Sequence, residues 1–384
     1  MLKKYDISSM KYIKTPLVLC ALSFLFSNAN AWEQDKAQFI YNIGFDQRFD
    51  NREYDASGYS ASGTIFGTRL SPTIGLKLRS GDAVHTLIGG ADIRKDFGDI
   101  NTTGKGLVKD YFYYYDFKTP LANGVFTIDG GVFPRYKSRE SWSTAFISEK
   151  VSWYDPYIEG LLFRYSTSSA NVELGLDWMG MYGADSAVNE QFMIFSAGHR
   201  SFSEFITLGY NAYMVHFANS VMVRGVCDNC LTEPYMTMDF THFLSCLDKC
   251  SLKLGYLQAI QRDRTVSLDF DCPALVEASV NVALKGWHIQ NSFYAGDDIL
   301  PLYDKTDAAG NIYGDRLYFA DPFFKIKTGD NDGPLPFYDR LELGYSTVLW
   351  GNLTVAASWI FHFNTSAYSG SQQVISLRYL LKER

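Results

Sequence analysis

Residues 172–178 read Val-Glu-Leu-Gly-Leu-Asp-Trp, and this stretch decides the fold. Apolar side chains alternate in it with glycine and carboxylates. Because successive side chains of a β-strand point to opposite faces, the stretch predicts a strand with one apolar face and one polar face. The same period of two returns along the chain, for example at 39–46, 206–211 and 341–346. The sequence therefore predicts an all-β protein.

The predicted strands are long. Soluble strands average roughly 5–6 residues and bilayer-spanning strands need roughly 9–11, and the segments here fit the longer class. This length favours a closed antiparallel transmembrane barrel over a soluble β-sandwich, in which the apolar faces would point inward. We predict about sixteen strands, near residues 36–48, 62–78, 81–96, 107–118, 123–136, 155–166, 169–181, 190–201, 204–217, 235–245, 250–262, 275–285, 286–297, 337–348, 352–363 and 372–382.

The connections between these strands alternate in length. Even-numbered connections include tight turns such as 79–82 and 350–352, whereas odd-numbered ones are long, such as 137–154 and 298–336. Short periplasmic turns on one rim and long extracellular loops on the other are typical of up-and-down outer-membrane barrels. An even number of strands places both ends of the barrel on the periplasmic rim.

The N-terminal segment has the features of a secretory signal peptide. Lys11 and Lys14 precede an apolar run, and residues 29–31 form an A-x-A cleavage site. We predict a signal peptide at 1–31 and one barrel domain at 32–384. After the signal peptide, no apolar run approaches the roughly 18 residues that a spanning helix needs.

The composition supports a membrane barrel and excludes a nucleic-acid partner. Aromatic residues make up 16% of the 384 residues and charged residues only 20%. Tyrosine and phenylalanine are strand formers and favour membrane interfaces. The net charge is −7, and no run of lysine or arginine marks a nucleic-acid-binding surface.

The signal peptide, the strand pattern and the asymmetric connections together resemble those of porin-like outer-membrane β-barrel proteins of Gram-negative bacteria. Residues 68–75, 85–87 and 97–98 are similar to barrels of the Bacteroidota type. The resemblance implies a location in the cell outer membrane, with membrane lipid and the outer-membrane assembly machinery as partners. Such barrels usually finish on an aromatic residue, whereas Tyr379 is followed here by Leu-Leu-Lys-Glu-Arg.

Alternation also assigns charged side chains to the inward face of the barrel. A barrel of sixteen strands is wide enough for water, so these side chains favour a charged, water-filled pore; the alternative is a lumen packed with mutually satisfied ion pairs. Opposite charges occur in similar numbers, which argues against strong selection for ions of one sign. The lumen-facing candidates are Arg48, Arg69, Asp92, Arg94, Asp96, Asp129, Arg135, Glu173, Asp177, Asp239, Arg340, Glu342 and Arg378.

Two long connections are candidates for narrowing the pore. The segment 137–154 breaks the strand rhythm, and a short helix in it would either fold into the lumen or form an exposed cap. Its candidate constriction residues are Arg139, Phe146 and Trp153. The loop 298–336 is the other candidate, and its aspartates lack the spacing of a calcium-binding EF-hand.

Five cysteines follow the signal peptide. Cys227 and Cys230 have C-x-x-C spacing, which indicates a structural disulfide in an oxidising compartment; free thiols and a metal or redox site are the alternatives. Because successive connections alternate between the rims, we expect Cys227, Cys230 and Cys272 on the extracellular rim. Cys246 and Cys250 are expected on the periplasmic rim.

Catalytic motifs are absent from the sequence. The six histidines are scattered over separate predicted strands, and no G-x-S-x-G, H-E-x-x-H or P-loop motif occurs. We therefore expect no enzyme activity, no cofactor and no metal. The sequence favours a channel for passive diffusion of small hydrophilic solutes. The alternative is a non-channel barrel that displays its loops as a receptor, adhesin or assembly partner.

Overall fold

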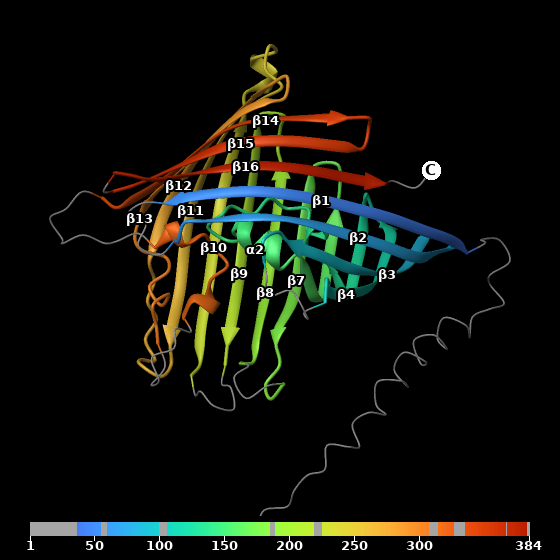
Figure 1. The fold of residues 1–384 in the computed structure, drawn as a ribbon, viewed down its shortest axis with the longest axis horizontal. Helices are drawn as coiled ribbons and strands as arrows, with labels where there is room; N and C mark the ends of the chain where they lie inside the picture. Colours follow the sequence, from blue (N-terminus) through green and yellow to red (C-terminus); the bar gives the residue numbers. More distant parts are fainter. Residues whose placement is uncertain are drawn as a thin grey trace, which may run out of the picture.

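The structure is a computed structural model that describes residues 37–54, 60–99, 106–184, 189–218, 225–306, 314–325, 335–365 and 367–381. These residues form a closed barrel of sixteen antiparallel strands, in which each strand pairs with its neighbours in sequence and β16 closes onto β1 (Figure 1). Within this part of the chain, no helix is long and apolar enough to cross a membrane. The predicted signal peptide at 1–31 lies outside the described residues.

The described residues form sixteen strands, and three of the connections between them contain short helices. The strands are β1 (Gln38–Tyr54), β2 (Gly63–Ser80), β3 (Ala83–Asp96), β4 (Val108–Leu121), β5 (Gly124–Pro134), β6 (Tyr157–Ser166), β7 (Ala170–Gly180), β8 (Gln191–Ser201), β9 (Ile206–Phe217), β10 (Cys227–Asp239), β11 (Lys249–Asp263), β12 (Ala274–Leu284), β13 (Trp287–Gly296), β14 (Phe337–Leu349), β15 (Leu353–Asn364) and β16 (Ala367–Leu381). The helices are η4 (Arg135–Lys137), α2 (Glu149–Tyr154), η5 (Thr241–Phe243), η6 (Gly314–Leu317) and η7 (Pro322–Phe324).

Most predicted strands match the observed ones within a few residues. β1 runs six residues beyond its predicted end at 48, β16 begins five residues before its predicted start at 372, and β10 differs at both ends. The sequence predicted this strand at 235–245, whereas it begins at Cys227 and ends at Asp239. A proline cannot donate to a strand ladder and normally marks an edge or an end of a strand, yet Pro234 lies inside β10. In the barrel the pairing of β10 with β11 is interrupted between Thr232 and Tyr235, and Pro234 is accommodated at this interruption.

The two rims of the barrel differ as predicted. Most connections that follow an even-numbered strand are tight, such as 81–82 between β2 and β3, and they define the short-turn rim. The connections that follow odd-numbered strands are generally longer and define the long-loop rim. Two connections depart from the pattern. Residues 240–248, between β10 and β11, lie on the short-turn rim but contain η5, and only two residues separate β15 from β16 on the long-loop rim. Since Ile43 pairs with Leu381, the start of β1 and the end of β16 lie together on the short-turn rim.

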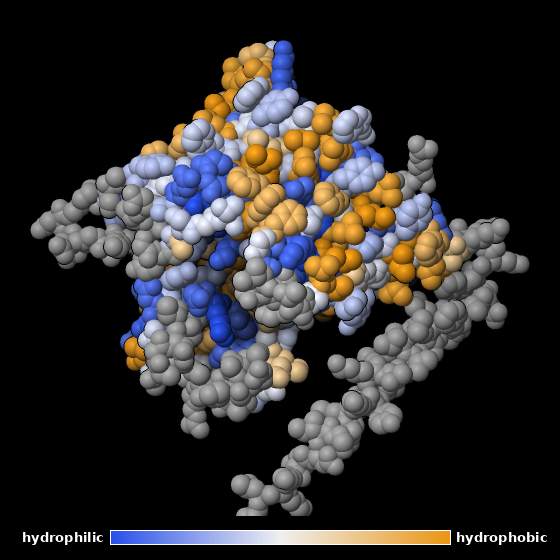
Figure 2. All heavy atoms as spheres, in the orientation of Figure 1, coloured by the Kyte–Doolittle hydropathy of each residue, from blue (hydrophilic) through white to orange (hydrophobic). Residues whose placement is uncertain are grey.

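The outer wall carries an apolar band. Phe39 is 60% exposed, Leu76 is 49% exposed and Trp287 is 66% exposed, all on the outward face. Figure 2 shows apolar residues spread over the outer surface of the barrel. Apolar surface of this extent is unfavourable in water and is accommodated by hydrocarbon, so the barrel spans a membrane. Alternation along the strands places further apolar side chains on the same outward face: Tyr41, Ile128, Leu176, Leu343 and Val355.

The barrel also contains a hydrophobic core inside its ring of strands. Two long connections supply it: the segment 135–156, between β5 and β6, and the described parts of 297–325, between β13 and β14. Phe146 from the first and Phe324 from the second are fully buried, and they belong to one cluster with inward side chains of the wall such as Leu257. Part of the lumen is therefore filled with packed side chains.

Candidate functional site

The segment 135–156 lies inside the barrel, where Figure 1 shows α2 within the ring of strands. Ser148 begins this helix: its hydroxyl oxygen accepts a hydrogen bond from the backbone N–H of Val151 at 3.2 Å. A serine in this position satisfies one of the free N–H groups of the first turn. The candidate constriction residues Phe146 and Trp153 are both buried. The segment is thus an infolded loop and not an exposed cap.

Glu149 fixes the start of α2 to two strands. One carboxylate oxygen accepts from Arg48 of β1, and the other accepts from Arg340 of β14 at 2.7 Å. Burial alone would raise the pKa of this carboxyl, but Arg340 and Arg48 outweigh it and lower the pKa to about 2. The carboxylate therefore stays charged over the physiological pH range and links the infolded segment to the wall.

Two further arginines of the wall hold the end of α2. Arg69 of β2 donates to the carbonyl oxygen of Trp153, and its guanidinium lies 4.8 Å from the centre of the Trp153 ring. Arg94 of β3 donates to the carbonyl oxygen of Tyr154 at 3.3 Å and lies 4.6 Å from the centre of that ring. Cation–π contacts of this kind contribute about 0.5–2 kcal/mol each. The wall from β1 to β3 is thus the side on which α2 is fastened.

Arg135 ties together the two ends of the infolded segment. Its guanidinium forms ion pairs at 2.9 Å with Asp155, at the end of the segment, and at 2.9 Å with Asp177 of β7. It also donates to the carbonyl oxygen of Tyr157 at 2.8 Å. Burial raises the pKa of Asp155 despite the neighbouring Arg135. These contacts close the segment into a loop that returns to the wall where it left.

Lys137 and Glu140 anchor the first half of the segment. Lys137 pairs with Asp116 of β4 at 2.6 Å and with Asp129 of β5 at 3.1 Å. Burial opposes the charge of Lys137, but Tyr114 and these carboxylates outweigh it and raise the lysine pKa. Glu140 contacts His199 Nδ1 at 2.9 Å and accepts from the amide of Asn171. The anchor therefore consists of several ionic contacts and not one.

The segment 297–325 fills the opposite side of the lumen, along β10 to β14. Phe323 stacks on His362 of β15, with ring centroids 4.2 Å apart and planes at 5°. Tyr338 of β14 lies parallel to the Phe323 ring, with centroids 5.4 Å apart, and its hydroxyl forms a hydrogen bond of 2.8 Å with His362 Nδ1. Lys325 closes the described part through an ion pair with Asp298 at 3.0 Å. This half of the lumen is filled with packed aromatic and aliphatic side chains, among which a few ion pairs are buried, such as Lys253 with Glu233 and Glu277.

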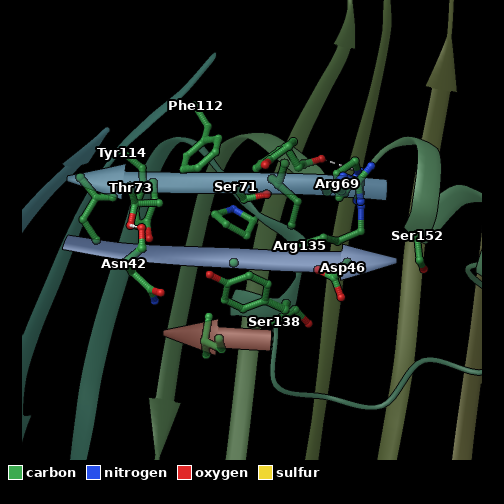
Figure 3. A pocket seen from close by; sticks show the side chains of 18 of the residues that line it. Asn42, Asp46, Arg69, Ser71, Thr73, Phe112, Tyr114, Arg135, Ser138 and Ser152 are labelled. Carbon is green, nitrogen blue, oxygen red and sulfur yellow. Dashed lines mark hydrogen bonds between the residues drawn. The ribbon is translucent and has the colours of Figure 1, made fainter. Parts of the chain in front are cut away.

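Two cavities of the barrel interior lie beside the segment 135–156, one on each side of it. The larger, of about 950 Å³, lies toward the short-turn rim; its lining runs from Ile40 at the start of β1 to Leu380 at the end of β16 (Figure 3). The smaller, of about 560 Å³, lies toward the long-loop rim and includes Asp110 at the start of β4. We call them the short-turn cavity and the long-loop cavity. Tyr157 lines both cavities, whereas Arg135 lines the short-turn cavity and Asp155 lines the long-loop cavity.

The structure places the predicted lumen residues on the inward face, and most of them are paired. Asp239 lies apart, at the short-turn rim, where it accepts from the backbone N–H of Thr241 at 2.8 Å. Glu173 accepts hydrogen bonds from the hydroxyl of Ser138 and from the backbone N–H of Arg139. Arg139, a candidate constriction residue, thus contacts the wall through its main chain. The remaining pairs are Arg48 with Asp50, Arg69 with Asp92, Arg94 with Asp96, Asp129 with Lys137, Arg135 with Asp177, Arg340 with Glu342, and Arg378 with Asp46.

Sequence reasoning missed the residues that dock the infolded segment. Glu149, Lys137 and Glu140 lie in a stretch with no strand period, so alternation says nothing about their direction. Asp50 carried a signal, since it follows Arg48 by two and shares its face, but the predicted strand ended at residue 48. Arg164 of β6 donates to the carbonyl oxygen of Lys137. Alternation along its predicted strand could have identified Arg164 as an inward-facing side chain.

The predicted disulfide between Cys227 and Cys230 is wrong. All five cysteines of the described chain are free. Both residues lie in β10, three positions apart, so their side chains point to opposite faces: Cys227 is buried in the interior and Cys230 is on the outer wall. Cβ vectors that point apart cannot be bridged. Cys272 lies beyond the long-loop end of β11, and Cys246 lies in the 240–248 connection at the other rim.

No group of three or more histidine, cysteine, aspartate or glutamate side chains in the described ranges is arranged to hold a metal ion. No protein-family model matches the chain, and no curated protein matches it.

Two solved structures are similar to this barrel. OpdL of Pseudomonas aeruginosa has a TM-score of 0.52 and 8% sequence identity, and the match covers 90% of this chain and 99% of that chain. A loop L8 deletion mutant of OmpT, an outer membrane protein of Vibrio cholerae, has a TM-score of 0.52 and 11% identity, with the same coverage of 90% and 99%. At these identities the likeness establishes the fold alone, which is that of outer-membrane porins. The resemblance to barrels of the Bacteroidota type stays a prediction.

Proposed function

We propose that this barrel is an outer-membrane channel for the passive diffusion of small hydrophilic solutes. The observation that carries the proposal is the pair of cavities on opposite sides of the segment 135–156. Both lie on the β1–β9 side of the lumen, where charged and hydroxyl side chains face the interior. The β10–β14 side is more tightly packed, because the described parts of 297–325 cover it with aromatic and aliphatic side chains.

The route of a solute runs from the long-loop cavity, past Arg135 and Tyr157, to the short-turn cavity. The segment 135–156 narrows this route, so solute size is the first selection. Because most lumen charges are paired with opposite charges, we propose weak selection for ions of one sign. We assign the barrel no catalytic role; membrane lipid, the solutes and the outer-membrane assembly machinery are its proposed partners.

Planar-bilayer recording tests this proposal directly. The full mature chain is reconstituted and current is measured in potassium chloride, where a channel gives discrete steps. A variant without residues 139–152 serves as the matched comparison, and its conductance is expected to be larger because the lumen is wider. If neither protein gives steps, the barrel does not conduct, and display of the long loops replaces diffusion as the function.

A further inference from the structure

The short-turn cavity has the dimensions of a small-molecule site. Its volume of about 950 Å³ lies at the upper end of the range of roughly 300–1,000 Å³ for ligand pockets. Apolar and aromatic side chains form much of its wall, with polar groups set among them. A general diffusion pore needs no such lining. We therefore expect a ligand that has both an apolar face and polar groups to fit this cavity.

Most charged groups of this cavity are neutralised by an opposite charge; the exception is Glu140, which contacts His199 Nδ1 and accepts from the amide of Asn171. Arg378 pairs with Asp46 at 2.6 Å, Arg69 with Asp92 at 2.9 Å, and Arg135 with Asp177 at 2.9 Å. A charged solute would have to compete with one of these pairs, which leaves an opposite charge behind. An uncharged solute meets no such penalty, so the electrostatics favour a neutral ligand.

Hydroxyl and amide groups line one side of the cavity. Asn42 of β1 and Ser71 and Thr73 of β2 lie around the same space as Ser138 of the infolded segment (Figure 3). The hydroxyl groups of Ser71, Thr73 and Ser138 and the amide of Asn42 are groups that can exchange hydrogen bonds with the hydroxyl groups of a ligand.

An aromatic ring reaches into the same space. Tyr136, on η4, lines the cavity and is 78% exposed although it lies inside the barrel. Phe112 and Tyr114 of β4 stand on the wall of the cavity (Figure 3). An exposed ring offers a flat apolar face, and the apolar face of a pyranose ring is complementary to it.

We propose that the short-turn cavity binds an uncharged sugar, a mono- or disaccharide, whose ring lies on Tyr136 and whose hydroxyl groups bond to Asn42, Ser71 and Thr73. The combination of paired charges, hydroxyl and amide groups and an exposed ring carries this assignment. It deepens the proposed channel function by naming the solute class, but binding itself does not require conduction.

Calorimetric titration of the detergent-purified mature barrel tests the assignment. Glucose and maltose are titrated against two charged pyranoses of the size of glucose, glucuronate and glucosamine, and against benzyl alcohol as a neutral solute without sugar hydroxyls. We expect the neutral sugars to bind more tightly than all three. Equal or tighter binding of a charged sugar or of benzyl alcohol overturns the assignment, as does the absence of sugar binding.

Two substitutions test the geometry. Tyr136→Ala removes the stacking face and is expected to weaken sugar binding about 3–10-fold, the effect of one aromatic contact, whereas Tyr136→Phe retains most of the affinity. Tyr111→Ala, on the outer wall, is the matched control and leaves binding unchanged. Unaltered affinity in Tyr136→Ala refutes the placement. A barrel that binds sugar but gives no current steps overturns the channel proposal and leaves this inference standing.

Discussion

Substituting Glu149→Gln should release the infolded segment from the wall. The carboxylate joins α2 to Arg48 and Arg340, and these arginines lower its pKa from 4.5 to about 2. That difference corresponds to about 3.4 kcal/mol. Because the side chain is 32% exposed, solvent screening reduces the contribution to about 1–2 kcal/mol. A loss of this size raises the ratio of released to docked segment by a factor of about 5–30.

The assay is single-channel recording in a planar bilayer. Glu149→Gln should show a larger mean conductance and more current noise than the unsubstituted barrel. Glu204→Gln is the matched control, because Glu204 is 86% exposed at a turn of the short-turn rim, and its ion pair there, with the exposed His242 at 3.6 Å, does not involve the infolded segment. Conductance and noise equal to those of the control would show that the ion pairs of Glu149 do not hold the segment.

Acid provides an independent check of the same contact. The pKa of Glu149 is lowered on docking, so its contribution is complete above about pH 4.5 and is lost as the pH falls toward 2. The conductance of the unsubstituted barrel should therefore rise in that window. Other carboxyl groups titrate there too, so the informative quantity is the part of the rise that Glu149→Gln lacks. An identical acid response in both proteins contradicts the reasoning.

Three further predictions concern the wall, the second infolded segment and the cysteines. Leu176→Arg, on the outer face, should cost about 2–4 kcal/mol of membrane stability, measured by reversible unfolding in lipid vesicles, and more than Ser279→Arg on the lumen face; equal costs would contradict the assigned faces. Phe323→Ala removes a buried ring stacked on His362 and should destabilise the packing of its segment by about 3–5 kcal/mol. Limited proteolysis should then cleave that segment faster, and an unchanged cleavage rate would contradict its packing inside the lumen. A membrane-impermeant maleimide should label Cys272 but not Cys246 on intact cells, and a mass-spectrometric bridge between Cys227 and Cys250 would refute the topology.

The strands of this fold could be predicted from sequence because their signal is local. Alternation such as that at 172–178 depends only on which side chains face lipid, and the membrane imposes that requirement on every strand. The limit is visible at β10. The predicted strand began only at residue 235, whereas β10 begins at Cys227 and contains Pro234 at a point where one ladder is interrupted. The same error hid the meaning of Cys227 and Cys230, because correct strand parity would have placed them on opposite faces.

The candidate site was predictable only in part. The lengths of 137–154 and 298–336 indicated material for a constriction, and Phe146 and Trp153 were identified as candidates for it. The docking of that segment was not predictable, because Glu149 meets Arg48 and Arg340, residues far from it in the chain, and no local period encodes such a meeting. Periodicity identifies the direction of a side chain but not its partner.

The bridge from α2 to β1 and β14 also bears on the order of assembly. Hairpins of successive strands form from local contacts, whereas the seam between β1 and β16 joins residues such as Asp46 and Arg378, 332 positions apart. Closing so long a loop carries the larger entropic cost, so we expect the seam to close late. Arg48 and Arg340 stand on opposite sides of that seam, and Glu149 can engage both only after it has closed. Docking of α2 is then the last event of maturation, and an intermediate with an unclosed seam would carry an unobstructed interior.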